Sequence, residues 1–227
     1  MKNIDKLVLP SNGLMPGVPR EVTIRAMQGD ELSTLYSSLT DASIEEVIQA
    51  VTKEQLNPDT LCDEDKAAIL HKTRRLTFGD IVQQTQVCPH CQKVHTYEID
   101  YNDFEFTELD IELFKTDIVL SNGDKVTRRL PNKEILQDIE VAKKRRPLKK
   151  GEMFNVLLFS KIETVNNKRL TLLEGLEWLS NLKGTDWVLL SKMLDIRFGL
   201  NVSYVVECPS CELAFTGGLG INADLFR

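Results

Sequence analysis

The stretch LTFGDIVQQTQVCPHC at residues 76–91 returns in altered form as IRFGLNVSYVVECPSC at residues 196–211. In both stretches a Phe-Gly pair stands at the same distance before a CPxC motif, so that Cys88 and Cys208 are 120 residues apart. Strand-like residues precede each motif and follow it. A CxxC turn between two strands is typical of one knuckle of a zinc ribbon, and we expect each half of the chain to supply one knuckle.

Two CxxC turns together provide the four ligands that a tetrahedral structural zinc requires. The proline inside each turn fixes its backbone φ and stiffens the loop. We therefore predict one structural zinc ion per chain, in a ribbon split between the two halves and closed to a catalytic water. The predicted ligands are Cys88, Cys91, Cys208 and Cys211.

Two other uses of these cysteines stay open at this point: independent redox pairs, or thiols without a metal. Redox CxxC pairs usually lie where a strand meets the N-terminus of a helix, whereas these motifs lie between strands. His90 could replace a cysteine ligand, although His90 and His95 are interpreted as polar loop residues. Cys62 has no counterpart in the second half and is interpreted as a semi-buried residue before a helix that begins at residue 63.

The beginnings of the two halves are also alike, since VLPSNG at 8–13 resembles VLSNG at 119–123. We predict an internally duplicated α+β unit of strands or a hairpin, then helices, then a strand–knuckle–strand. The first copy would span 1–110 with the knuckle at 88–91, and the second 111–227 with the knuckle at 208–211. The shared zinc would close both copies into one compact unit.

Helix signals support this order of elements. Residues 63–76 carry acidic side chains in the first turn and arginines in the last, which suits the helix dipole, and Gly79 is expected to end that helix. In the second half, residues 171–182 and 185–199 are predicted to be two helices. The second of them is expected to end at Gly199, just as the helix that begins at residue 63 ends at Gly79.

The composition is that of an ordinary globular protein, with 42% hydrophobic and 27% charged residues in 227 positions. The net charge of −6 gives no global attraction for nucleic acid. No apolar run approaches the length of a membrane span, and the N-terminus has no signal-peptide core. We expect a protein of a reducing cytoplasm. No nucleophile elbow, P-loop, GxGxxG or HExxH motif is present, so the sequence does not indicate an enzyme.

Two further stretches are candidate contacts with partners. The run KKRRPLKK at 143–150 has six basic residues in eight, which fits an acidic protein partner, a nucleic acid or simply a solvated helix end. The loop at 11–21 contains Leu14 and Met15, which would contact a partner if they formed an exposed apolar tip.

Several segments together resemble the baseplate hub proteins of T-even-type contractile-tailed phages. They are LPSNGLMPGVPREVTIRAM (9–27), RRLTFG (74–79), VCPHCQKVHTYEID (87–100), VECPSCELAF (206–215) and DLFR (224–227). The resemblance covers nearly the whole chain. It implies a non-enzymatic assembly protein of the tail baseplate hub, whose partners are other hub and tail assembly proteins. It also implies a place in the host cytoplasm during assembly, and retention in the virion stays open.

The sequence thus predicts a zinc-stabilised scaffold without a membrane partner. A zinc-ribbon adaptor for nucleic acid or transcription is the alternative, and a thiol redox enzyme is a third. Whether the chain assembles with itself is not indicated.

Overall fold

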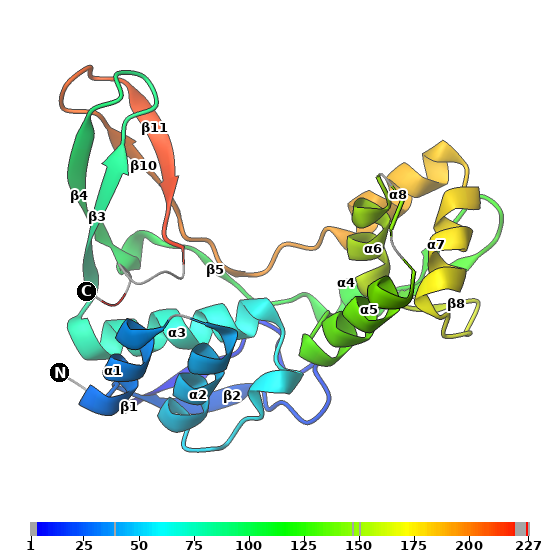
Figure 1. The fold of residues 1–227 in the computed structure, drawn as a ribbon, viewed down its shortest axis with the longest axis horizontal. Coiled ribbons are helices and arrows are strands. Elements are labelled where there is room, and N and C mark those ends of the chain that lie inside the picture. The colour runs from blue at the N-terminus through cyan, green and yellow to red at the C-terminus, as the bar shows by residue number, and fades with distance from the viewer. Residues whose placement is uncertain (1–3, 39, 147, 150, 221–225, 227) are drawn as a thin grey trace.

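The computed structural model describes residues 4–38, 40–146, 148–149, 151–220 and 226. Helices are mixed with small antiparallel sheets, which confirms the predicted α+β class. Figure 1 shows two lobes connected by extended segments, with two β-hairpins rising side by side from the first lobe. The fold therefore brings the two CPxC motifs, which are far apart in the sequence, close together in space.

The first lobe contains the N-terminal elements and the first hairpin. Its strands β1 and β2 pair antiparallel, and α1, α2 and α3 lie beside them (Figure 1). Helix α3 ends at Phe78, and Gly79 follows with φ +92°, as the sequence predicted. In chain order the elements are β1 (Ile4–Val8), β2 (Glu21–Arg25), α1 (Gly29–Ser37), α2 (Asp41–Val51), η1 (Pro58–Thr60), α3 (Asp63–Phe78), β3 (Ile81–Val87), β4 (Val94–Asp100) and η2 (Tyr101–Asp103).

The second lobe contains a three-stranded sheet of order β6-β7-β8 and four of the helices that follow. The sequence analysis did not anticipate α6 and β8. The elements are β5 (Phe106–Thr107), which leads into this lobe, then α4 (Ile111–Lys115), β6 (Ile118–Val119), β7 (Lys125–Arg128), α5 (Lys133–Arg145), α6 (Glu152–Ser160), β8 (Ile162–Val165), α7 (Leu172–Asn181) and α8 (Gly184–Leu194).

Each lobe has its own hydrophobic core. The first is formed by apolar residues of the N-terminal strands and helices, and it also takes in Leu219 and Phe226 from the C-terminal end of the chain. The second is formed between Ile118 and Leu194 and packs the three-stranded sheet against the helices. The chain thus leaves the first lobe, builds the second, and returns to the first.

The return segment corrects one prediction. The helix expected at 185–199 ends at Leu194, because the next residues must span the distance back to the first lobe. Ile196 and Phe198 pack against the first core there, and this burial outweighs helix continuation. Two short strands complete the return: β9 (Gly199–Leu200) pairs with β5, and β10 (Ser203–Glu207) begins the second hairpin with β11 (Ala214–Gly218).

A Ser–Asp hydrogen bond fastens the start of each half, and it is buried in the first half and partly buried in the second. The backbone N–H of Ser11 donates to Oδ1 of Asp65 over 2.9 Å, and that of Ser121 donates to Oδ1 of Asp186 over 2.9 Å. Each aspartate is the third residue of a helix, α3 or α8, so its charge also faces the positive end of that helix. The pKa values of the two aspartates shift in opposite directions. Burial raises the pKa of Asp65, whereas the Ser121 hydroxyl and N–H lower the pKa of Asp186.

This difference predicts losses of unequal size when the charge is removed. Asp186→Asn is expected to lower the melting temperature at pH 7 clearly, and Asp65→Asn much less, because an amide escapes the desolvation that the Asp65 carboxylate bears. Since the folded pKa of Asp186 is depressed, its contribution is present above about pH 4 and is lost as the pH falls further. Thermal melts of both variants at pH 7 and pH 3 test this. An equal loss at pH 7 would contradict the assignment.

Candidate metal centre

The two hairpins present their CPxC turns with the same backbone geometry. In the first, the N–H of Cys88 donates to the carbonyl of Lys93 over 2.9 Å, and that of Gln92 donates to the carbonyl of Cys88 over 2.9 Å. In the second, the N–H of Cys208 donates to Leu213 over 3.1 Å, and that of Glu212 to Cys208 over 2.8 Å. Each pair of cysteines therefore lies in a tight turn between two strands, as predicted, and not at a helix N-terminus.

Both turns also use the same unusual backbone conformation. Gln92 and Glu212, which follow the second cysteine of each motif, have φ of 60°. A non-glycine residue rarely adopts this left-handed conformation, and it turns the chain sharply back into the second strand. Since the two motifs fold alike, each directs both of its sulfurs to the same side of the hairpin tip.

The four cysteine sulfurs meet in one cluster between the hairpin tips. Sγ of Cys88 lies 3.7 Å from Sγ of Cys211, and Sγ of Cys91 lies 3.7 Å from Sγ of Cys208. All four sulfurs lie within 4.8 Å of one another. For a tetrahedral zinc with Zn–S bonds of about 2.3 Å, the expected sulfur–sulfur separation is about 3.8 Å. The donor set therefore fits a zinc ion of the structural class.

Burial and charge support the same conclusion. Cys88 and Cys208 are fully buried and Cys91 and Cys211 partly buried. Burial raises the pKa of the Cys208 thiol, but the backbone N–H groups of Ser210 and Cys211, together with hydrogen bonds from the thiols of Cys88 and Cys211, lower it to about 6 overall. Thiolates this close repel one another unless a cation lies between them. A divalent metal would remove that repulsion, and these four residues alone would hold it.

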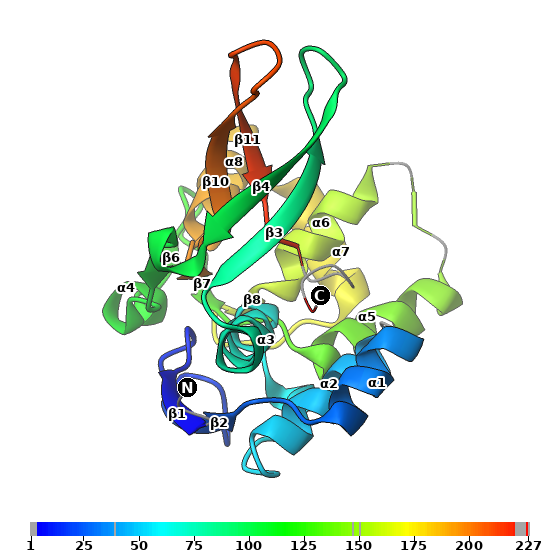
Figure 2. The same ribbon diagram turned by 90° about the vertical axis from the view of Figure 1, so that its left-hand side faces the viewer.

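The contacts around the cluster join the two hairpins along their length. Tyr97 and Phe215 meet edge to face with ring centroids 6.0 Å apart, one from each hairpin. Nearer the tips, Nε2 of His95 lies 3.1 Å from Oγ of Ser210, and His90 approaches the carbonyl of Ala214 at 3.4 Å. Both histidines thus contact the opposite hairpin. Figure 2 shows the two hairpins side by side, with both tips projecting beyond the helices.

Among the described residues, the group able to hold a metal consists of the four knuckle cysteines and includes neither histidine. Cys62 lies elsewhere, at the N-cap of α3. It is fully buried, more so than predicted, and burial raises its pKa strongly. A buried thiol of this kind is inert and acts as a small apolar side chain.

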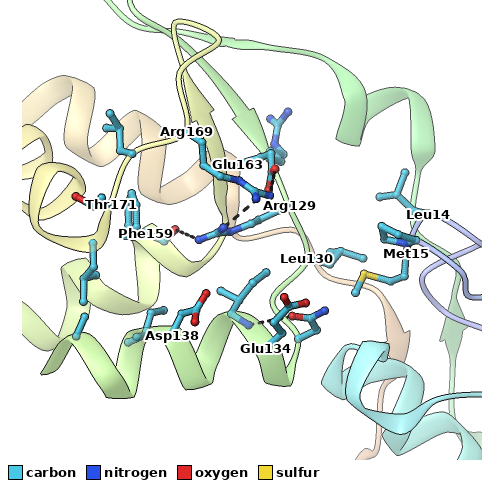
Figure 3. Close-up of a pocket in the computed structure, with 18 of the residues that line it drawn as sticks. Leu14, Met15, Arg129, Leu130, Glu134, Asp138, Phe159, Glu163, Arg169 and Thr171 are labelled. Carbon is cyan, nitrogen blue, oxygen red and sulfur yellow. Dashed lines mark hydrogen bonds and ion pairs between the residues drawn. The ribbon is translucent and has the colours of Figure 1, made fainter. Parts of the chain in front are cut away.

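A second feature is a pocket of about 530 Å³ where the two lobes meet (Figure 3). Leu14 and Met15 of the first lobe line one side. Met15 is only 6% exposed and packs into the first core, so it does not form the exposed apolar tip considered as a possible partner contact. On the other side, Arg129 donates to the carbonyl of Ser160 over 2.9 Å, and Glu163 pairs with Arg169. These charged groups satisfy one another, and the pocket is a seam between lobes.

No helix in the described part of the chain is long and apolar enough to cross a membrane.

Comparison with known proteins gives one family. Residues 1–216 match the family model described as T4 bacteriophage base plate protein. No curated protein and no solved structure matches the chain. The match covers both hairpins up to the second strand of the second one, and so includes all four cysteines of the cluster.

Proposed function

The chain belongs to the T4 bacteriophage base plate protein family, and we propose that within the phage baseplate it is a zinc-stabilised scaffold of the hub. It would bind other hub proteins while the baseplate and tail are assembled in the host cytoplasm. Membership of the family makes it a structural protein of the phage baseplate. The hub location, the zinc and the partners are the proposal. The observation that carries it is the cluster of four cysteines from knuckles 120 residues apart.

The four cysteines would act as a clasp between distant parts of the chain. Bound zinc supplies a fourfold cross-link and no reaction at this closed site. The residues themselves do the rest: the Tyr97–Phe215 contact aligns the hairpins, and the hydrogen bonds of each knuckle aim the sulfurs inward. Because the second hairpin follows the whole second lobe, closing the clasp ties that lobe to the first. A rigid two-lobed body is the expected product.

The proposal includes an internal duplication, with copies at 1–110 and 111–227. Three matched features support it besides the sequence. The Ser–Asp contacts fasten corresponding loops to corresponding helices. Gly79 and Gly199, 120 positions apart, have φ of +92° and +94°. The two sulfur pairs separated by 3.7 Å, Cys88–Cys211 and Cys91–Cys208, are exchanged by swapping one copy for the other. Such exchange is what a pseudo-twofold axis through the metal site would produce.

A nucleic-acid adaptor is the second candidate, favoured by the basic run at 143–150, of which Pro147 and Lys150 lie outside the described residues. Binding to DNA that weakens steeply with salt would support it. The net charge of −6 and the family membership favour the baseplate role instead.

The proposed role predicts a specific assembly defect. A phage unable to make this chain is expected to accumulate filled heads without baseplates or contractile tails, visible by electron microscopy of infected-cell lysates. Supplying the unaltered chain should restore tails, and supplying Cys208→Ser/Cys211→Ser should not. Normal tails in the absence of the chain would refute a role in assembly. Full rescue by the double variant would refute the zinc clasp and leave the role in assembly intact.

A further inference from the structure

Helix α6 presents an apolar stripe to solvent. Met153, Phe154 and Leu157 are 50%, 53% and 54% exposed, and their spacing of one and four residues places them on one face of the helix. The opposite face, with Val156 and Phe159, is buried in the second core. A helix normally exposes its polar side, so three large apolar side chains on the solvent face of a nine-residue helix require an explanation.

The stripe continues onto α8 through Trp187. The rings of Phe154 and Trp187 lie with centroids 5.2 Å apart, and Nε1 of Trp187 donates to Oδ1 of Asn155 over 3.0 Å. This hydrogen bond fixes the indole beside the stripe. The resulting surface, called here the α6 stripe, consists of Met153, Phe154, Leu157 and Trp187. Tryptophan is enriched among the residues that carry binding energy in protein interfaces, and methionine is common at adaptable binding surfaces.

Basic groups flank one end of the α6 stripe. Arg146 donates to both carboxylate oxygens of Glu152, over 3.0 and 2.9 Å, which fastens the end of α5 to the first residue of α6. Lys144 and Lys149 are exposed beside this junction. Among the described residues neither ammonium group has a carboxylate within 4.0 Å, although Arg146 and, more weakly, the charge of Lys149 lower the pKa of Glu152. The N-terminus of α6 adds positive partial charge at the same place. A positive end on a chain of net charge −6 favours an acidic partner over a nucleic acid.

We propose that the α6 stripe and its basic end form the docking site for an acidic amphipathic helix of another baseplate protein. This rests on the proposed function, which supplies the kind of partner. The partner helix would lay its apolar residues on Met153, Phe154 and Leu157 and direct its carboxylates to Lys144 and Lys149. Such docking buries the exposed apolar surface and gives the two lysines partners, so one occupant explains both features.

Site-specific photocrosslinking tests the proposal in the assembling phage. The chain carrying p-benzoylphenylalanine in place of Phe154 replaces the phage's own copy during infection, and the adduct is mapped by mass spectrometry. The matched control places the same probe at Leu173, which is 50% exposed on α7 of the same lobe. We expect an adduct at position 154 that joins an acidic amphipathic segment of another baseplate protein. Lys144→Glu/Lys149→Glu should lower its yield at least about fivefold, with an unchanged melting temperature.

Several results would overturn the proposal: no adduct above the Leu173 control, an adduct with a second copy of this chain, an adduct with nucleic acid, or a yield that ignores the lysine changes. The outcome for the baseplate role is separate. An adduct with an acidic amphipathic helix of a protein outside the tail would preserve the docking chemistry and contradict the proposed function. An assembly defect without an adduct would support the proposed function and contradict the docking site.

Discussion

A chain in which Cys208 and Cys211 are both serine is expected to purify without zinc, where the unaltered chain purified without chelator holds one ion. Its melting temperature should fall by about 10 °C or more. Structural zinc sites contribute on the order of 10 kcal/mol to folding in small domains. The variant can relax and recover part of this free energy. A remaining loss of several kcal/mol would still lower the melting temperature of a chain of this size by about 10 °C.

The effect should reach well beyond the hairpin tips. Val82 and Ile99 of the first hairpin and Leu219 beyond the second belong to the core of the first lobe. When the hairpins separate, this apolar surface is exposed and the first lobe loses part of its packing. The return segment, held by the two-residue pairing of β5 with β9, is then less constrained as well. We expect faster proteolysis of residues 195–219 in the variant.

Cys62→Ser is the matched control, because it removes the remaining cysteine of the chain and leaves the cluster intact. Cys62 occupies the N-cap of α3, where serine is a favourable residue. This variant should keep its full zinc content. Zinc retained by the double variant, held by Cys88 and Cys91 alone, would contradict one shared site and reopen the interpretation of independent knuckles.

The geometry of each knuckle could be predicted from sequence because it is local, and the pairing of the two knuckles was predicted because one structural zinc needs four ligands. Spacing within each CPxC motif, and strands on either side, determine where each pair of sulfurs points. The end of α3 at Gly79 was predictable for the same reason, since a glycine with positive φ stops a helix wherever it lies. The geometry of each knuckle and the end of α3 depend on a few adjacent residues, so the rest of the fold does not alter them.

The parts that sequence did not predict depend on distant contacts. Ile196 and Phe198 continue the helical pattern of α8, but they lie in the crossing between lobes and pack on the first core instead. The burial of Met15 was not evident from its loop, because the core that contains it also includes Phe114 and Leu130, far along the chain. Helix α6 was missed because its apolar residues lie on both faces, so no single stripe marks it.

Acid is expected to weaken the first lobe through one buried histidine. His71 on α3 is enclosed in the core, and its Nδ1 lies 2.8 Å from the hydroxyl of Tyr101, which follows the first hairpin. Burial, with the nearby Arg74 guanidinium, lowers the pKa of His71 to about 4. The neutral ring can therefore accept the Tyr101 hydrogen bond at neutral pH. Protonation would leave a charge in the core and cancel that bond.

The sign of the pH dependence follows from linkage. An unfolded histidine binds a proton below about pH 6.5, while the folded His71 stays neutral until about pH 4. The unfolded state thus binds more protons in that window, and stability rises with pH through it. Falling pH should remove about 2 kcal/mol of the free energy of unfolding between pH 7 and pH 5, and about 3 kcal/mol in total by pH 4.

His71→Gln isolates this contribution, because glutamine does not titrate and its amide oxygen can still accept from Tyr101. Urea unfolding of both chains at pH 7 and pH 5, with zinc content measured at each pH, gives the comparison. Loss of zinc as thiolates are protonated affects both chains equally and cancels in the difference. We expect the variant to be the less stable chain at pH 7, to lose about 2 kcal/mol less than the unaltered chain on going to pH 5, and so to overtake it in acid. Parallel losses in the two chains would show that the ring of His71 is accessible to protons in the folded state, and that Tyr101 does not hold it neutral.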